Sequence, residues 1–136
     1  MEPRFAPAQH ALGLACQHMG MLEEAIVEFQ NARVCSANHP ASTAALAHAY
    51  AISGRRPEAE ELLNELQQQS GKRRVSSYWV AIVYAGLEEK TMAVRWLEQA
   101  RSDRDVWLVW LAAEPRFDQL RAEGLVDNLL STIRPR

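Results

Sequence analysis

Four histidines and one tyrosine are the residues of this chain best suited to binding chemistry: His10, His18, His39, His48 and Tyr78. Imidazole and phenol groups bind ligands through hydrogen bonds and stacking, and imidazole can also ligate a metal. The histidines do not follow the Cys/His spacing of known metal sites, so we expect no metal centre. His10, His18, His48 and Tyr78 remain candidates for holding a peptide or a small ligand.

The basic run Lys72, Arg73 and Arg74 is the second candidate. Guanidinium and ammonium groups in such a run can grip an acidic peptide or a phosphate at the edge of a binding site. The same run also fits a solvated loop. The formal net charge of the chain is −2, which gives no electrostatic reason to expect nucleic acid or an acidic membrane as partner.

Acidic side chains gather in three stretches of the sequence, where they do not indicate acid–base catalysis. Some stand where the first turn of a helix favours negative charge, and the others suit a solvated face. The residues are Glu23, Glu24, Glu28, Glu58, Glu60, Glu61, Glu65, Glu88, Glu89 and Glu98. No glycine-rich phosphate loop, nucleophile elbow or Ser/His/Asp order is present. We therefore expect neither enzymatic activity nor a cofactor.

The elements that position these residues must be helices of one domain. The chain has 136 residues, of which 48% are hydrophobic, and is rich in the helix formers Ala, Leu and Glu. Cys16 and Cys35 lie at unequal distances from a turn near Gly20, so we expect free thiols in a reducing compartment. The N-terminus is unlike a signal peptide and no apolar run could span a membrane, which together predict a cytoplasmic protein.

A repeat of 34 residues organises most of the chain. Ala25, Ala59 and Ala93 share this spacing, and other columns repeat with it. The columns are Leu12, Leu46 and Val80; Gly13, Ala47 and Ala81; Cys16, Tyr50 and Tyr84; Phe29, Leu63 and Leu97; and Ala32, Leu66 and Ala100. The small residues let two helices approach closely, and the larger ones, Leu12 among them, should fill the space between helices.

Turn residues mark the helix ends within each unit. Gly20 and Gly54 suit a left-handed C-cap, and Pro57 suits the first turn of the helix that follows. Glu88 stands where the third glycine is expected, so that turn should be strained or differently shaped. The patterns predict helices over about residues 7–20, 22–36, 41–53, 56–69, 76–87 and 89–102.

This pattern, over about residues 6–107, resembles the tetratricopeptide repeat (TPR). The residues that carry the resemblance are Leu12, Gly13, Cys16, Gly20, Ala25, Phe29 and Ala32, with their counterparts in the next two units. It implies an all-α, right-handed solenoid of three helical hairpins, in repeats of about 6–39, 40–73 and 74–107, closed by a cap of about 108–136. The whole chain, 1–136, would be a single TPR-like domain.

The resemblance also implies which residues form the binding surface, because first helices line the concave groove in such proteins. The groove residues expected to bind a partner are His10, Leu14, Gln17, His18, Ala44, His48, Ile52, Tyr78 and Ile82. Lys72, Arg73 and Arg74 would lie at its edge. The Lys, Asn and Arg positions that clamp acidic chaperone tails are not matched, so such a tail is not the expected ligand.

The C-terminal segment breaks the repeat phase and should seal the third unit. Trp96-Leu97, Trp107-Leu108 and Arg116–Arg121 resemble the closing part of bacterial TPR regions attached to winged-helix regulators, serine/threonine kinases or nucleotide cyclases. Pro3, at the place of an inter-repeat proline, favours a fragment of a longer protein over a short protein that starts abruptly.

These features predict a protein–protein interaction module that binds a peptide or domain in its concave groove. The alternatives are a regulatory, dimerisation or ligand-sensing region of a larger bacterial signalling or transcription-regulating protein. A protein or peptide is the expected partner, with no direct role for nucleic acid or membrane, and a homodimer remains open.

Overall fold

The chain is all-helical in the part that the computed structural model describes, which is residues 7–35, 40–69, 77–105, 108, 111 and 114–133. No β-strand occurs among these residues. The elements are α1 (Pro7–His18), α2 (Leu22–Cys35), α3 (Pro40–Ile52), α4 (Arg56–Gln69), α5 (Ser77–Gly86), α6 (Lys90–Ser102), the 3₁₀ turn η2 (Pro115–Phe117), α7 (Asp118–Ala122) and α8 (Asp127–Ile133). The six helices expected from the repeat are confirmed to within two residues at each end.

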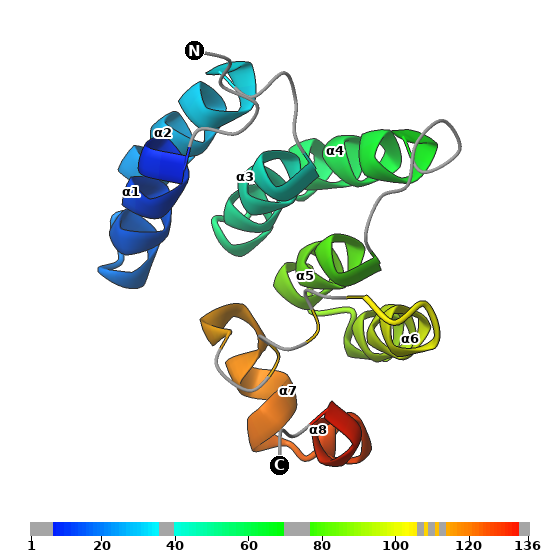
Figure 1. Cartoon of the computed structure of the whole chain (residues 1–136). Helices are drawn as coiled ribbons and strands as arrows, with labels where there is room; N and C mark the ends of the chain where they lie inside the picture. The colour runs from blue at the N-terminus through cyan, green and yellow to red at the C-terminus, as the bar shows by residue number, and fades with distance from the viewer. Residues whose placement is uncertain are drawn as a thin grey trace.

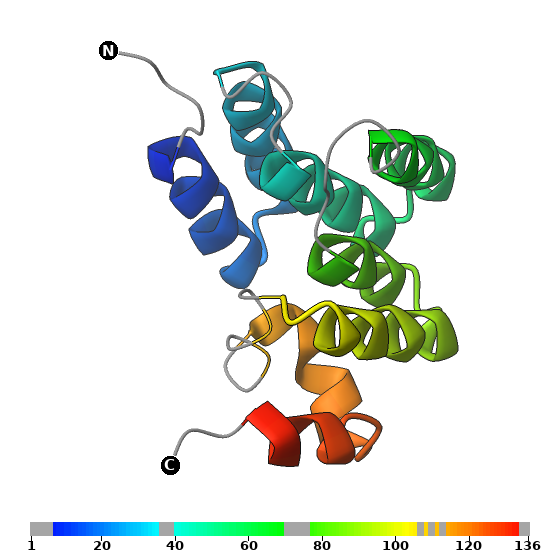
Figure 2. The same ribbon diagram turned by 45° about the vertical axis from the view of Figure 1, so that its right-hand side comes forward.

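The first six helices form three successive pairs, each joined by a short turn. α1 packs on α2, α3 on α4, and α5 on α6, while α3 also contacts α2 and α5 (Figure 1). α3 is therefore the central element, and its residues 41–49 are all buried. Figure 2 shows the third pair followed by α7 and α8, which lie at the far end of the chain from α1.

The turns within the three pairs have the same backbone geometry. Gly20, Gly54 and Glu88 adopt left-handed φ values of 81°, 88° and 63°. The next amide after each donates back to the preceding helix, as in a Schellman motif: Met21 to the Cys16 carbonyl at 2.8 Å, Arg55 to Tyr50 at 2.8 Å and Glu89 to Tyr84 at 3.0 Å. The third turn is therefore strained at Glu88, as expected, but it keeps the shape of the other two.

The small-residue columns lie where helices approach most closely. Ala25, Ala59 and Ala93 are fully buried. A Cβ atom added to Gly13 would lie 2.5 Å from Cε1 of the buried Phe29 ring, so only glycine fits there. These contacts explain why the 34-residue spacing preserves side-chain size.

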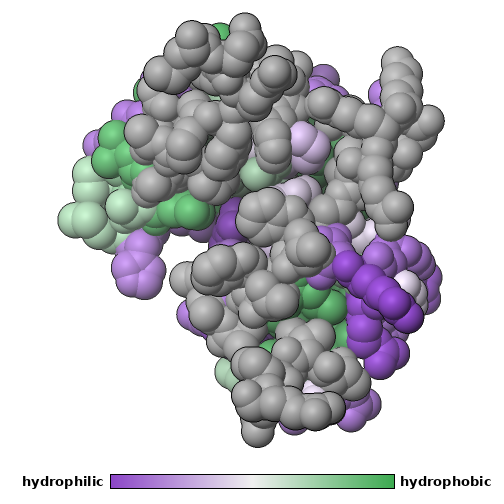
Figure 3. Space-filling view, viewed as in Figure 1, coloured by the Kyte–Doolittle hydropathy of each residue, from purple (hydrophilic) through white to green (hydrophobic). Residues whose placement is uncertain are grey.

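Leu12 departs from its column, and the expectation that it fills an interhelical space is wrong. Its counterparts Leu46 and Val80 are 3% exposed, whereas Leu12 is 51% exposed. Leu46 faces α2 of the preceding pair, and no described helix precedes α1. Figure 3 shows further hydrophobic side chains over the α1–α2 end, where Met19 and Met21 are exposed.

The C-terminal segment packs on the third pair, with buried Phe117, Leu120, Val126 and Leu129. The Phe117 ring meets the buried Tyr78 ring edge-on, at a centroid distance of 5.4 Å and an interplanar angle of 77°. α6 also contacts α8. Trp107 and Trp110, which we expected in this cap, lie outside the described residues, as does the N-terminal stretch 1–6. No helix of the described part is long and apolar enough to cross a membrane.

The packing predicts the effect of enlarging one small residue. Ala59→Leu should lower the free energy of unfolding by about 1–3 kcal/mol, because the fully buried site has no room for three more carbon atoms. Urea unfolding measures the change. Ala15→Leu, on the exposed side of α1, is the control and should alter stability by less than about 0.5 kcal/mol. Equal midpoints for the two variants would show that the assigned packing is wrong.

Candidate functional site

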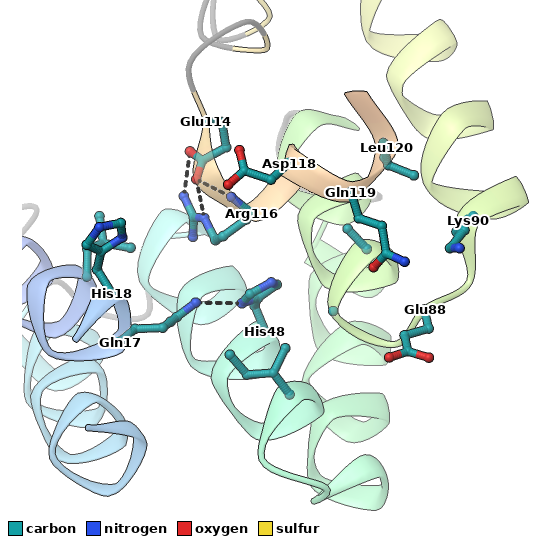
Figure 4. Close-up of a pocket in the computed structure, with 14 residues that line it drawn as sticks. Gln17, His18, His48, Glu88, Lys90, Glu114, Arg116, Asp118, Gln119 and Leu120 are labelled. Atoms are coloured by element: carbon teal, nitrogen blue, oxygen red, sulfur yellow. Dashed lines mark hydrogen bonds and ion pairs between the residues drawn. The ribbon is translucent and has the colours of Figure 1, made fainter. Parts of the chain in front are cut away.

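A cleft of about 660 Å³ lies between α1, α3, the residues around the α5–α6 turn and the C-terminal segment (Figure 4). One side carries side chains from α1, and the opposite side carries side chains from the α5–α6 turn and α7. Of the predicted groove residues, those that line it are Leu14, Gln17, His18, His48 and Ile52. The structure therefore brings together side chains of two first helices, as the sequence predicted.

Three predicted groove residues do not line this cleft, and their assignment to an open surface is wrong. Ala44 and Ile82 are fully buried, and Tyr78 is 1% exposed. Ala44 lies in the stretch of α3 that is buried throughout. Tyr78 is covered by the Phe117 ring of the C-terminal segment. The repeat phase could not reveal this covering, because the segment lies outside the repeat.

His48 forms part of the buried wall of the cleft and is 5% exposed. Gln17 Nε2 donates to its Nδ1 over 3.1 Å, which requires a neutral ring with the proton on Nε2. Burial, assisted by the positive charge of Arg116 and opposed by Glu114, lowers the pKa of His48 to about 3. Gly86 leaves space for the ring, since a Cβ there would lie 2.7 Å from His48 Cδ2. His48 is therefore an uncharged packing group at neutral pH.

A buried ion pair in the C-terminal segment forms another wall. Arg116 donates from Nε and Nη2 to the two carboxylate oxygens of Glu114 over 2.8 and 3.1 Å, and its backbone amide donates over 3.2 Å. The side chains are 5% and 13% exposed, respectively. Burial acts to raise the pKa of Glu114, but the hydrogen bonds and charge of Arg116 outweigh it, so this pKa lies below its ordinary value.

Arg121 fixes the path of the same segment. Its Nη1 donates to the carbonyls of Leu111 and Glu114 over 2.8 and 2.7 Å, and its Nη2 pairs with Asp118. The Glu114 carbonyl also accepts from the Phe117 amide over 3.1 Å, so Arg121 adds side-chain hydrogen bonds to the backbone on both sides of residues 112 and 113.

Sequence reasoning missed this wall, which consists of Glu114, Arg116, Asp118, Gln119 and Leu120. From the sequence, this segment is expected only to cover apolar surface of the third unit. The available signal was the set of charged residues around Phe117, because a cap that merely buries apolar surface does not need them. Three further lining residues were also not assigned to the site: Gly86 at the end of α5, Glu88 in the turn and Lys90 at the start of α6.

Other predicted site residues fall outside the described structure. Lys72, Arg73 and Arg74 belong to the undescribed stretch 70–76, and only the backbone of His10 is described. Their roles remain predictions. Within the described residues no three His, Cys, Asp or Glu side chains are grouped so that they could hold a metal ion.

The chain matches no protein-family model, no curated protein and no solved structure. The site is therefore interpreted from its own residues. It offers an open cleft with apolar side chains, neutral hydrogen-bonding groups and charged groups, an arrangement suited to holding a ligand.

The depressed pKa of His48 predicts a pH dependence of stability. In the unfolded state this histidine binds a proton once the pH falls below its ordinary pKa of 6.5. In the folded state it binds a proton only when the pH falls to about 3. The unfolded state therefore gains the extra proton between these values, and stability falls as the pH falls. Between pH 6.5 and 5 this group should remove about 1.5 kcal/mol from the free energy of unfolding.

Urea unfolding at several pH values measures this effect. His48→Gln should flatten the dependence between pH 6.5 and 5, because the variant has no group to protonate at this site. His18→Gln, at an exposed position, should leave the wild-type dependence in place. An unchanged dependence in His48→Gln would contradict the buried, neutral state of this histidine.

Proposed function

We propose that this chain is a TPR-like module that binds an extended segment of a partner protein in the cleft. The repeat supports the family assignment: three helix pairs follow one another, their turns share one geometry, and their alanine columns are buried. In the TPR architecture the first helices face a concave surface, and the cleft draws Leu14 from α1 and Ile52 from α3. A right-handed solenoid of hairpins with a cap is the corresponding arrangement.

The observation that carries the proposal is the composition of the cleft. Its volume of about 660 Å³ accommodates several peptide side chains. Leu14 and Ile52 offer partly exposed apolar surface beside the amide of Gln17. Such a mixture suits a peptide, which carries apolar side chains and a polar backbone together.

Two atoms behind the cleft surface support a polar ligand backbone. Gln17 Oε1 and Arg116 Nη1 are buried and have no hydrogen-bond partner within the described part of the chain. One is an acceptor and the other a donor, which matches the N–H and C=O groups of a peptide. Buried groups of this kind are normally satisfied, so a ligand is one way to complete them.

A small-ligand sensor is less well supported than a peptide-binding module. That hypothesis depended on histidine and tyrosine side chains in the groove, yet His48 and Tyr78 are buried. Among those whose side chains are described, only His18 presents an exposed side chain to the cleft. We propose the protein partner accordingly.

Selection from a random twelve-residue phage-displayed peptide library, followed by titration of the recovered peptides, tests the proposal. The full chain should recover peptides that bind with dissociation constants of about the micromolar range, because the cleft is short. Ile52→Arg should weaken their binding at least tenfold by placing a long charged side chain in the cleft. Ile52 is 42% exposed, so the substitution leaves the core intact.

Val34→Arg is the matched control, since Val34 is 80% exposed near the end of α2 and does not line the cleft. Binding should survive this change. If Val34→Arg abolishes binding and Ile52→Arg does not, the site lies on the exposed apolar surface of the first pair. Recovery of no peptides at all would also count against the proposal.

A further inference from the structure

The turn between α5 and α6 is built from a residue that its geometry disfavours. Glu88 has a φ of 63°, whereas the equivalent residues of the first two turns are the glycines Gly20 and Gly54. An L-residue with a Cβ is strained in this left-handed region, and glycine is not. Backbone strain of this kind motivates a search for what the side chain does. The side chain of Glu88 lies in the wall of the cleft (Figure 4).

Glu88 is also the uncompensated charge of the cleft. The other Asp, Glu, Lys and Arg side chains that line it are each paired: Lys90 with Glu123, Arg116 with Glu114, and Asp118 with Arg121. The Glu88 carboxylate forms no hydrogen bond or ion pair with any residue of the described ranges. The lining therefore carries one net negative charge, which favours a cationic ligand group.

The surroundings of this charge define the rest of the ligand group. Leu14 and Ile52 supply apolar surface along the same cleft, and the buried Leu120 lies behind its lining. Lysine and arginine side chains combine a cationic head with an apolar stem. The head can pair with the Glu88 carboxylate, and the stem can lie on the apolar surface. A neighbouring aliphatic side chain would cover the remaining apolar surface. An acidic peptide would instead meet an unpaired carboxylate.

We propose that the cleft recognises a lysine or arginine of the partner segment next to an aliphatic residue, with Glu88 as acceptor for the cation. The inference rests on the proposed function, because it names the class of peptide that the cleft selects. Glu88 is thereby the residue that sets specificity. It stands where the other two turns have a glycine, and its backbone is strained as a result.

Sequencing the phage-selected twelve-residue peptides tests this specificity. The wild-type pool should be enriched in Lys or Arg at a fixed distance from Leu, Ile or Val. The pool selected on Glu88→Gln should lose the basic position and keep the aliphatic one. Glu98→Gln, an exposed glutamate of α6 away from the cleft, should select the same peptides as wild type.

Titration of one wild-type-selected peptide gives a second measure. Its affinity should fall about fivefold for Glu88→Gln, the loss of one exposed charge pair. Peptides that depend on Ile52 but show no basic preference would overturn this inference and leave the proposed function standing. A basic preference that persists in Glu88→Gln would overturn it as well. An empty selection would overturn both.

The strain supplies an independent test with a matched control. Glu88→Gly should raise the urea midpoint of unfolding and weaken peptide binding, because it relieves the turn and removes the carboxylate. Arg104 ends α6 with a similar left-handed φ of 57°, but it does not line the cleft. Arg104→Gly should therefore raise the midpoint and leave binding unchanged. A Glu88→Gly variant that gains stability and binds as well as wild type would contradict the specificity role.

Discussion

The hydrogen bonds of two arginines fix the shape of the C-terminal segment, which forms one wall of the cleft. Arg116 is buried with Glu114, and Arg121 donates to two carbonyls of a stretch with few regular backbone hydrogen bonds. A buried charge without a partner is strongly unfavourable, so removing either member of the Arg116–Glu114 pair would release this stretch. Phe117 follows Arg116 in this segment, and its ring lies against Tyr78 of α5. One segment thus covers the core at Tyr78 and forms a wall of the cleft.

Much of the helical framework could be predicted from the sequence, because it depends on local geometry. A 34-residue spacing of alanines marks close helix approach, and Gly20 and Gly54 mark left-handed turns. Both signals can be recognised in the sequence without knowledge of the C-terminal segment. Even the strain at Glu88 followed from its place in the repeat. The same reasoning placed Gln17 and Ile52 in the cleft.

What could not be predicted depends on contacts between distant segments. Tyr78 and Ile82 have the repeat phase of groove residues, yet they are buried, Tyr78 under a segment that follows no repeat. Leu12 has the phase of a packed residue, yet it is exposed because no described helix precedes its own. Repeat phase gives the direction of a side chain within its own pair. It does not tell which neighbour, if any, covers that direction.

The central claim is that residues 114–122 lie against the third helix pair and complete the cleft. Nuclear Overhauser effects between the aromatic protons of Phe117 and Tyr78 test this most directly in the full chain. The ring centroids are 5.4 Å apart, so strong cross-peaks and ring-current-shifted Phe117 resonances are expected. Phe117 resonances at unfolded-chain positions, with no cross-peak to Tyr78, would contradict the account of the cleft.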